Sequence, residues 1–151
     1  MIKYIFKDFN SLNIQELYEL LQLRSAVFVL EQECVYLDMD DLDQKAVHLS
    51  GYNLDGKIMA YARILPKDIP YSGYCSIGRV ISSAEMRGKG LGKEIMSKSL
   101  QFCRKRHLGT PIKIMAQYYL LKFYQSFGFH MVGEKFLEDG IWHINMVMEN
   151  D

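Results

Sequence analysis

The stretch Arg87-Gly88-Lys89-Gly90-Leu91-Gly92 decides the fold prediction, because three alternating glycines there open a helical pattern. Between positions 90 and 107 the apolar residues recur on one helical face: Leu91, Ile95, Met96, Leu100 and Cys103. A β-rich run from 74 to 81 precedes the glycines. The first N–H groups of a helix are unpaired and attract anions, and glycine lets a ligand approach the backbone. The stretch therefore predicts a phosphate site, with Arg87 and Lys89 adding positive charge at its rim.

Three interpretations of such a turn compete with one another. A Walker A loop requires GxxxxGK[ST], but Gly92-Lys93 is followed by Glu94. The dinucleotide fingerprint requires GxGxxG, whereas the glycines here are at 88, 90 and 92, with no acid about 20 residues further on. Both of these nucleotide sites are excluded. A glycine-rich loop without a ligand stays open on this motif alone.

The hydrophobic pattern predicts further elements on both sides of the turn. Strands are expected at 2–7, 47–52, 57–65, 74–81, 112–116, 129–133 and 141–148, and helices at 14 to the mid-twenties, 90–107 and 118–127. Asn13 and Glu16 match a capping box at the first helix, and the acid-rich segment 31–45 reads as a loop. The order β-α-β-β-β-α-β-α-β-β indicates an α/β or α+β fold with one mixed sheet, in a single domain over residues 1–151.

Composition excludes several classes of protein. Eighteen basic and eighteen acidic residues cancel, so bulk charge gives no case for nucleic acid or an anionic membrane. The three cysteines are scattered, which argues against a disulfide framework or zinc site and for a reducing compartment. Charges interrupt the apolar residues of the first ten positions, and no apolar run approaches the ~20 residues of a membrane helix. We therefore expect a cytoplasmic protein.

A second motif follows the glycine turn. After the strand at 112–116 come Gln117, then Phe123-Tyr124, then Gly128-Phe129. Together with Arg87, Gly90 and Gly92 as R-x-x-G-x-G, the sequence resembles the GNAT acetyltransferase superfamily, which commonly shows N-x-x-A-x-x-F-Y-x-x-x-G-F at this place. Gln117 stands where the family often has Asn, and Leu120 where it often has Ala.

The likeness extends from about Arg24 to Met148, and within the family the sequence resembles the ElaA-like branch. It is carried by the stretches 28–36, 62–66, 77–80 and 139–146, together with Asp40, Asp43 and His48. Members of this branch often have Pro before the last histidine, where this chain has Trp142.

This resemblance implies a twisted mixed sheet of six or seven strands, flanked by about four helices and splaying apart after Ile81. Acetyl-CoA would lie in that V, with its pantetheine arm pairing along the strand backbone. A backbone N–H there would hold the thioester carbonyl. The implied donor-binding residues are Val80, Ile81, Arg87, Gly88, Lys89, Gly90, Leu91, Gly92, Lys93, Gln117 and Tyr124. Tyr124 would also stabilise the departing thiolate by a hydrogen bond.

The acceptor implied by the resemblance is an amine: a polyamine, an amino acid, an amino sugar, or a protein lysine or N-terminus. An amine attacks only when neutral, so a base is needed, and the hypothesis is that His143 serves. A hydrogen-bonded strand histidine is the alternative. Candidate substrate-binding residues are Arg24, Glu31, His48 and Arg79, although His48 could equally organise the acidic loop.

The acidic loop and the overall function leave further alternatives open. Arg24, Arg63 and Arg79 would either balance the acids Asp38, Asp40, Asp41 and Asp43 or hold an acceptor carboxylate. No metal is expected there, since the EF-hand glycine and terminal Glu are missing. Small GNAT folds often pair through apolar edges, which suggests a homodimer. Two rival functions stay open: a non-catalytic acetyl-CoA sensor, and an interaction domain without a cofactor.

Overall fold

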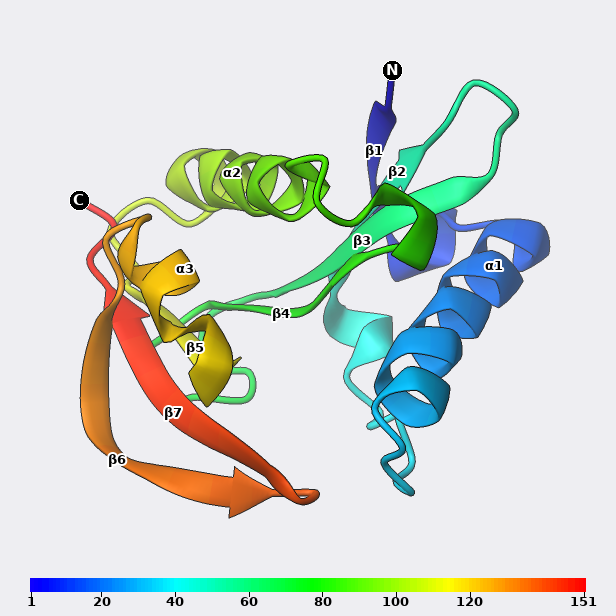
Figure 1. Cartoon of the computed structure of the whole chain (residues 1–151). Helices are drawn as coiled ribbons and strands as arrows, with labels where there is room; N and C mark the ends of the chain where they lie inside the picture. The colour runs from blue at the N-terminus through cyan, green and yellow to red at the C-terminus, as the bar shows by residue number, and fades with distance from the viewer.

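The computed structural model describes residues 1–151 and contains seven strands and three α-helices (Figure 1). In chain order these are β1 (Lys3–Asp8), α1 (Ile14–Arg24), β2 (Val47–Tyr52), β3 (Ile58–Leu65), β4 (Ser76–Ser82), α2 (Leu91–Arg106), β5 (Ile112–Gln117), α3 (Leu121–Gln125), β6 (His130–Glu138) and β7 (Ile141–Met148). The predicted order of strands and helices is confirmed. No helix is long and apolar enough to cross a membrane.

The strands form two sheets rather than one continuous sheet. The first has the order β1-β2-β3-β4 and the second β5-β7-β6, and all neighbours are antiparallel. A single parallel bridge between Cys75 and Ile112 joins them at the base of β4 and β5. Beyond this bridge β5 pairs only with β7, and the β6–β7 hairpin runs away from β4 (Figure 1). The predicted splaying of the central strands is therefore present, and it divides the sheet in two.

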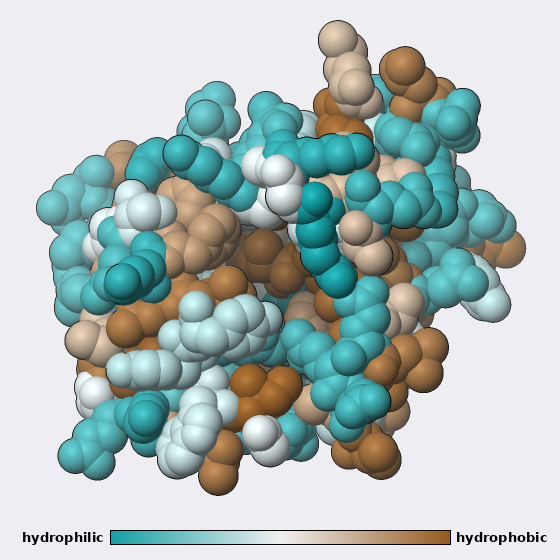
Figure 2. Space-filling view, in the orientation of Figure 1, coloured by the Kyte–Doolittle hydropathy of each residue, from teal (hydrophilic) through white to brown (hydrophobic).

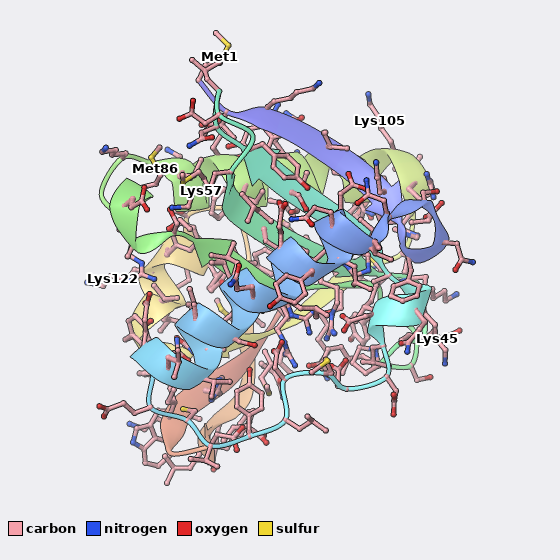
Figure 3. The ribbon with its side chains drawn as sticks, turned by 90° about the vertical axis from the view of Figure 1, so that its right-hand side faces the viewer. Met1, Lys45, Lys57, Met86, Lys105 and Lys122 are labelled. Atoms are coloured by element: carbon pink, nitrogen blue, oxygen red, sulfur yellow. The ribbon has the colours of Figure 1, made fainter.

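The helix α1 begins at the predicted capping box. The Asn13 side chain accepts from the Glu16 N–H at 2.7 Å, and the Glu16 carboxylate accepts from the Asn13 N–H at 2.9 Å. After Arg24 the helix continues directly as a π-helical segment, Ser25–Glu31, which is a fourth helical element. Figure 3 shows α1 crossing the face of the first sheet, where Leu20 packs against Tyr61 and Ile81.

The main core lies between α2 and the strands beneath it. The predicted apolar face of α2 is buried at every position: Leu91, Ile95, Met96, Leu100 and Cys103. These side chains pack with residues of β3, β4, β5 and β7, so α2 covers the junction of the two sheets. Burying one large aliphatic side chain contributes about 1.5–3 kcal/mol, and this helix therefore holds both sheets in one body.

The acidic loop is anchored by a buried network of charges, here called the charge cluster. It consists of Arg24, Arg63 and Arg79 with Asp38, Asp40 and Asp43, joined by N···O distances of 2.7–3.5 Å. Arg24 is fully buried and binds both Asp38 and Asp43. The arginines thus balance the acids, which was one of the two predicted alternatives.

His48 belongs to the same structural layer. Its Nε2 lies 2.9 Å from the Asp43 carbonyl, and its Nδ1 lies 2.6 Å from the Tyr61 hydroxyl. Burial lowers the pKa of His48, so the ring stays neutral, donates to the carbonyl and accepts from the phenol. Neither Arg24 nor His48 lines the main cleft, and both side chains are paired within this buried layer. The structure therefore gives both residues a structural role and does not support their predicted role in substrate binding.

The strand β6 is longer than predicted and reaches Glu138 rather than ending at Gly133. Gly133 has a φ of +76°, and the pairing with β7 shifts register between Val132 and Phe136. The glycine therefore marks an irregularity that interrupts the pattern without ending the strand. In the second half of β6, Phe136 pairs with His143 of β7.

Candidate active site

A cleft of about 520 Å³ lies where the two sheets separate. Its walls come from β4, from the end of β5 with α3, from the β6–β7 hairpin, and from the segment that follows α1. Figure 2 shows this hollow near the centre of the molecule, with apolar residues inside it and hydrophilic residues along its rim. An elongated ligand could lie in it with a polar end at the rim.

The inner wall of the cleft is the free edge of β4. Pairing with β3 is interrupted between Tyr61 and Arg63, so that Arg79 and Val80 form a bulge, and Arg79 has a φ of +50°. Val80 and Ile81 line the cleft. Since β4 is the last strand of its sheet, its outer N–H and C=O groups have no strand partner beyond Cys75. Such an edge can pair with an extended ligand.

The glycine turn leads from β4 into α2 and ends at the rim of the cleft. Gly88 and Gly90 have φ values of +79° and +77°, and Gly90 is the N-cap of α2. The first helical hydrogen bond runs from the Glu94 N–H to the Gly90 carbonyl, and no side chain caps the helix. The N–H groups of residues 91–93 are therefore free for an anion.

Gly92 is not explained by the fold itself. It has no left-handed φ, and a Cβ built there would meet no atom within 4 Å. Glycine inside a helix costs about 0.5–1 kcal/mol relative to alanine, so this position lowers stability without a packing reason. A glycine facing open space at a helix N-terminus fits a phosphate group that approaches the backbone closely.

Tyr124 reaches the cleft from α3. The side chain is only 8% exposed, lines the cleft, and packs edge-on against Phe123 and Phe129. Its hydroxyl forms no hydrogen bond within the chain. Burial raises the pKa of Tyr124 to about 12, so the phenol remains a neutral O–H donor over the physiological range.

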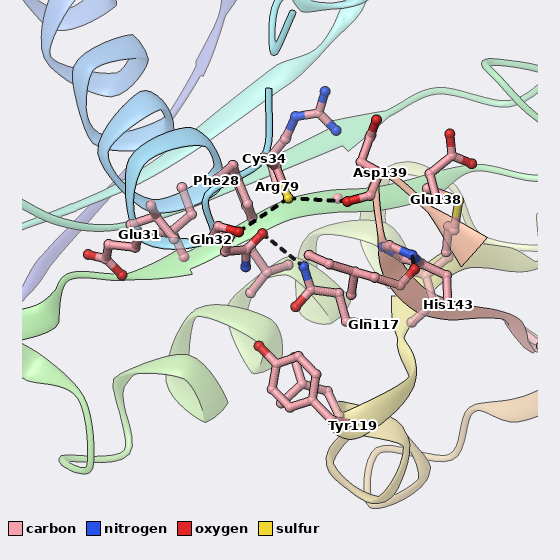
Figure 4. A pocket seen from close by; sticks show the side chains of 18 of the residues that line it. Phe28, Glu31, Gln32, Cys34, Arg79, Gln117, Tyr119, Glu138, Asp139 and His143 are labelled. Atoms are coloured by element: carbon pink, nitrogen blue, oxygen red, sulfur yellow. Dashed lines mark hydrogen bonds between the residues drawn. The ribbon is translucent and has the colours of Figure 1, made fainter. Parts of the chain in front are cut away.

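His143 lies on β7, directly opposite Gln117 of β5. It is 8% exposed, lines the cleft, and stacks on Phe136. Its Nδ1 lies 2.8 Å from the Ile141 carbonyl, which can only accept a hydrogen bond. In the neutral ring Nδ1 therefore carries the proton, and Nε2 is an acceptor without a partner in the chain. Figure 4 shows His143 near Gln117, Glu138 and Asp139.

Half of the predicted site residues line this cleft. Its lining includes Glu31, Arg79, Val80, Ile81, Arg87, Gln117, Tyr124 and His143. The turn that follows Arg87 lies next to the cleft and contains the other predicted residues: Gly88, Lys89, Gly90, Leu91, Gly92 and Lys93. The Leu91 side chain belongs to the core. Arg79 reaches the cleft but uses Nε and a terminal nitrogen on Asp38, at 2.8 and 2.9 Å.

Several lining residues were not among the predicted site residues. Among them are Gln32, Cys34, Tyr36, Tyr119 and Asp139. The first three fall in the stretch 28–36 that carries part of the family resemblance, so a signal for them was present in the sequence. Asp139 begins the stretch 139–146, which also carries the resemblance. Tyr119 precedes the helix that carries Tyr124, and motif spacing gives no indication that its side chain contacts the cleft.

Comparison with known proteins identifies the architecture. The family model of the acetyltransferase (GNAT) domain matches residues 14–150. The chain belongs to the GNAT acetyltransferase family. Protein ElaA of Escherichia coli is 44% identical over 151 residues, which cover 99% of this chain and 97% of ElaA.

Solved structures agree with this assignment of the GNAT fold. The crystal structure of an acyl-CoA N-acyltransferase from Pseudomonas aeruginosa superposes with a TM-score of 0.92 and 41% identity, covering 97% of this chain and 99% of that chain. That of E. coli ElaA has a TM-score of 0.91 and 43% identity, covering 99% and 100%. The predicted acyl-CoA N-acyltransferase fold and the likeness to ElaA are confirmed.

Proposed function

We propose that this GNAT protein transfers an acetyl group from acetyl-CoA to a primary amine, by direct attack within a ternary complex. The proposal rests on the groups that are brought together in one cleft. A free strand edge and an uncapped glycine-rich helix start lie beside Tyr124 and His143. Both residues are more than nine-tenths buried, and the Tyr124 hydroxyl and His143 Nε2 have no partner in the chain.

The donor half of the cleft fits acetyl-CoA. The N–H groups of residues 91–93 and the Arg87 guanidinium would hold the pyrophosphate, and the free edge of β4 at Val80 and Ile81 would pair with the pantetheine arm. Gln117 is close enough to the cleft to bond an amide of that arm. When bound, the donor supplies an activated thioester, and the chain supplies its orientation.

The acceptor half supplies a base and a hydrogen-bond donor. In the proposed reaction His143 Nε2 removes one proton from the acceptor ammonium, the neutral nitrogen attacks the thioester carbonyl, and the C–N bond forms as the C–S bond breaks. The second proton that the nitrogen loses on becoming an amide passes to the CoA thiolate, which leaves as the thiol. The Tyr124 hydroxyl donates to the leaving sulfur. With the pKa of Tyr124 near 12, complete proton transfer to a thiolate with a reference pKa of about 8.5 is unfavourable. Tyr124 therefore acts by hydrogen bonding.

The acceptor half also bears on which acceptors fit. The arginines predicted as carboxylate holders, Arg24, Arg63 and Arg79, are engaged in the charge cluster. The cleft therefore supplies no free arginine of this set for an acceptor carboxylate. This favours amines such as polyamines or lysine side chains over acceptors that need their carboxylate bound.

Replacing His143 with glutamine tests the proposed function and the base together. A thiol-release assay with acetyl-CoA and a panel of amines should show turnover in the native protein. In the variant, kcat/KM should fall by about 10²–10⁴-fold, since general-base catalysis contributes that much. The loss should shrink as the pH rises toward the acceptor's own pKa, near 10.4 for a lysine-like amine, because the free amine then needs no base.

The matched control is His130→Gln, on the exposed start of β6 and outside the cleft. This change should leave both rate and pH profile intact. A His143→Gln variant with an unchanged pH–rate profile contradicts the base assignment. Acetyl-CoA binding without turnover of any amine would instead support a non-catalytic sensor.

Replacing Gly92 with alanine tests the donor site separately from the chemistry. We expect the free energy of unfolding to rise by about 0.5–1 kcal/mol, because helix propensity improves and no clash arises. The affinity for CoA should fall at least about tenfold, since a Cβ would push the phosphate away from N–H groups whose charged hydrogen bonds are worth about 1.5–3 kcal/mol. Chemical denaturation and calorimetry measure the two effects.

The control for this pair of effects is Gln101→Ala, an exposed position further along α2. It should leave CoA affinity unchanged. A Gly92→Ala protein that gains stability and keeps full affinity contradicts the phosphate placement.

A further inference from the structure

The segment 31–34, here called the strap, crosses the cleft and is held on its far side by three side-chain contacts. The Glu31 carboxylate lies 2.6 Å from the Arg87 guanidinium, Gln117 Nε2 donates to Gln32 Oε1 at 3.2 Å, and Cys34 Sγ lies 3.4 Å from the Asp139 carbonyl. Figure 4 shows the last two contacts and the position of Glu31 at the other end of the strap. All six residues line the cleft.

Two of these contacts occupy groups that the proposed donor needs. Arg87 begins the phosphate-binding turn, and its partner Glu31 is an anion. Gln117 is placed to bond an amide of the pantetheine arm, and its partner Gln32 offers an amide carbonyl. Because Glu31 and Gln32 are adjacent, they present an anion and an amide side by side, as the donor does.

We propose that Glu31 and Gln32 are an internal substitute for the donor, which acetyl-CoA must displace and which thereby sets donor affinity. The inference rests on the proposed function, because it assumes that Arg87 and Gln117 bind the donor. It changes the role predicted for Glu31, which becomes a competitor at the donor site rather than a ligand of the acceptor.

The strap is attached weakly enough to be displaced. The Glu31 and Arg87 side chains are 37% and 45% exposed, and exposed ion pairs contribute little to stability. Val35 and Leu37 follow the strap and are almost unpacked, at 101% and 76% exposure. The backbone N–H groups of residues 32–34 donate to carbonyls of the π-helical segment, the Tyr36 hydroxyl donates to Asp38, and the charge cluster fixes Asp38 itself. Release of Glu31 from Arg87 therefore needs only a side-chain change at the end of the π-helical segment, and backbone movement can be confined to residues 32–37.

Displacing the strap also affects the acceptor half. The contact of Cys34 with Asp139 brings the strap to the hairpin that carries His143. Donor binding that removes Glu31 and Gln32 from their partners would loosen this contact too. Access to His143 would then depend on the donor being in place.

A double-mutant cycle on CoA affinity tests the proposal, with free CoA as the probe and isothermal calorimetry as the measurement. Glu31→Gln should bind CoA about fivefold more tightly, the size of effect expected for removing an exposed ion pair. Arg87→Gln should bind about tenfold more weakly. The double variant should match Arg87→Gln alone, because Glu31 has nothing left to compete for.

The matched control is Glu85→Gln, which removes the same charge two residues before Arg87, where Glu85 pairs with Lys57. Its effect on CoA affinity should be smaller than that of Glu31→Gln and should persist beside Arg87→Gln. Hydrogen exchange supplies a second readout: CoA should increase exchange in residues 32–36 of the native protein while it protects the glycine turn.

Several outcomes would overturn the inference. These are equal effects of Glu31→Gln and Glu85→Gln, a gain in affinity that survives in the Arg87→Gln background, weaker binding by Glu31→Gln, or protection of 32–36 by CoA. If the native protein does not bind CoA, the donor site and hence the proposed function fail as well. Binding of CoA without the predicted cycle overturns the inference alone.

Discussion

Replacing Tyr124 with phenylalanine is expected to lower kcat about 100-fold while the affinity for acetyl-CoA stays within about twofold. The removed hydroxyl has no partner in the chain, so stability should not fall. A hydrogen bond to a developing anion is worth about 1.5–3 kcal/mol, which corresponds to a factor of about 10–100 in rate. Steady-state kinetics with saturating acceptor, together with direct titration of CoA, separates the two parameters.

Tyr119→Phe is the matched control, because Tyr119 also lines the cleft but is 73% exposed. It should retain nearly full kcat. The pKa of Tyr124 near 12 adds a second expectation: the native rate should show no loss from phenol ionisation between pH 8 and 10. A Tyr124→Phe protein with native kcat would remove the tyrosine from the mechanism.

Replacing Asp43 with asparagine is expected to lower the free energy of unfolding by about 3 kcal/mol. Asp43 lies 2.7 Å from an Arg24 nitrogen and 3.0 Å from an Arg63 nitrogen, and all three side chains are buried. Removing one partner of a buried ion pair costs about 3–5 kcal/mol, because the remaining charge is left uncompensated. Asparagine keeps an acceptor oxygen, so we expect a loss at the lower end of this range. Urea denaturation measures the change.

Asp41→Asn, in the same loop, is the control. Asp41 is exposed, belongs to no ion pair, and has a φ of +64° that asparagine tolerates. Its stability should change by less than about 0.5 kcal/mol. An Asp43→Asn protein as stable as the native one would show that the charge cluster contributes nothing net.

The same residue has a pH signature. Burial by itself would raise the pKa of Asp43, but the hydrogen bonds and charges of Arg24 and Arg63 outweigh it and hold the pKa below its usual range. The stabilisation is therefore complete above the unfolded pKa, about 3.9, and is lost as the pH falls through the lower folded value. The asparagine variant should lack this part of the acid-induced loss.

Local patterns were sufficient to predict the elements that form the proposed donor site. Arg87, Gly90 and Gly92 sit at fixed spacing between a β-rich run and an amphipathic helix, so strand, turn and helix start follow from neighbours in the chain. Tyr124 is placed by a second motif of the same kind. Each is a local arrangement, in which turn conformation and hydrophobic period act over a few residues.

Contacts between distant residues could not be predicted in this way. Whether Arg24 would bind the acceptor or balance the acidic loop stayed open, because no local pattern shows that Asp38 and Asp43 fold back onto it. The two sheets are joined by one bridge, between Cys75 and Ile112, and separate beyond it. The pairing of Glu31 with Arg87 likewise joins two segments that only tertiary structure brings together.

The pairing of Gln117 with His143 limits how the hairpin can change length during evolution. Successive side chains of a strand point to opposite faces, so loss of a single codon for a residue between the hairpin turn and His143 would shift the register by one. If the β5–β7 pairing took up this shift, the imidazole would face away from the cleft, although every residue of the motif would still be encoded. Changes of two codons would preserve the facing of both groups. Alignments of relatives should therefore show hairpin lengths that differ in even steps wherever this histidine is kept.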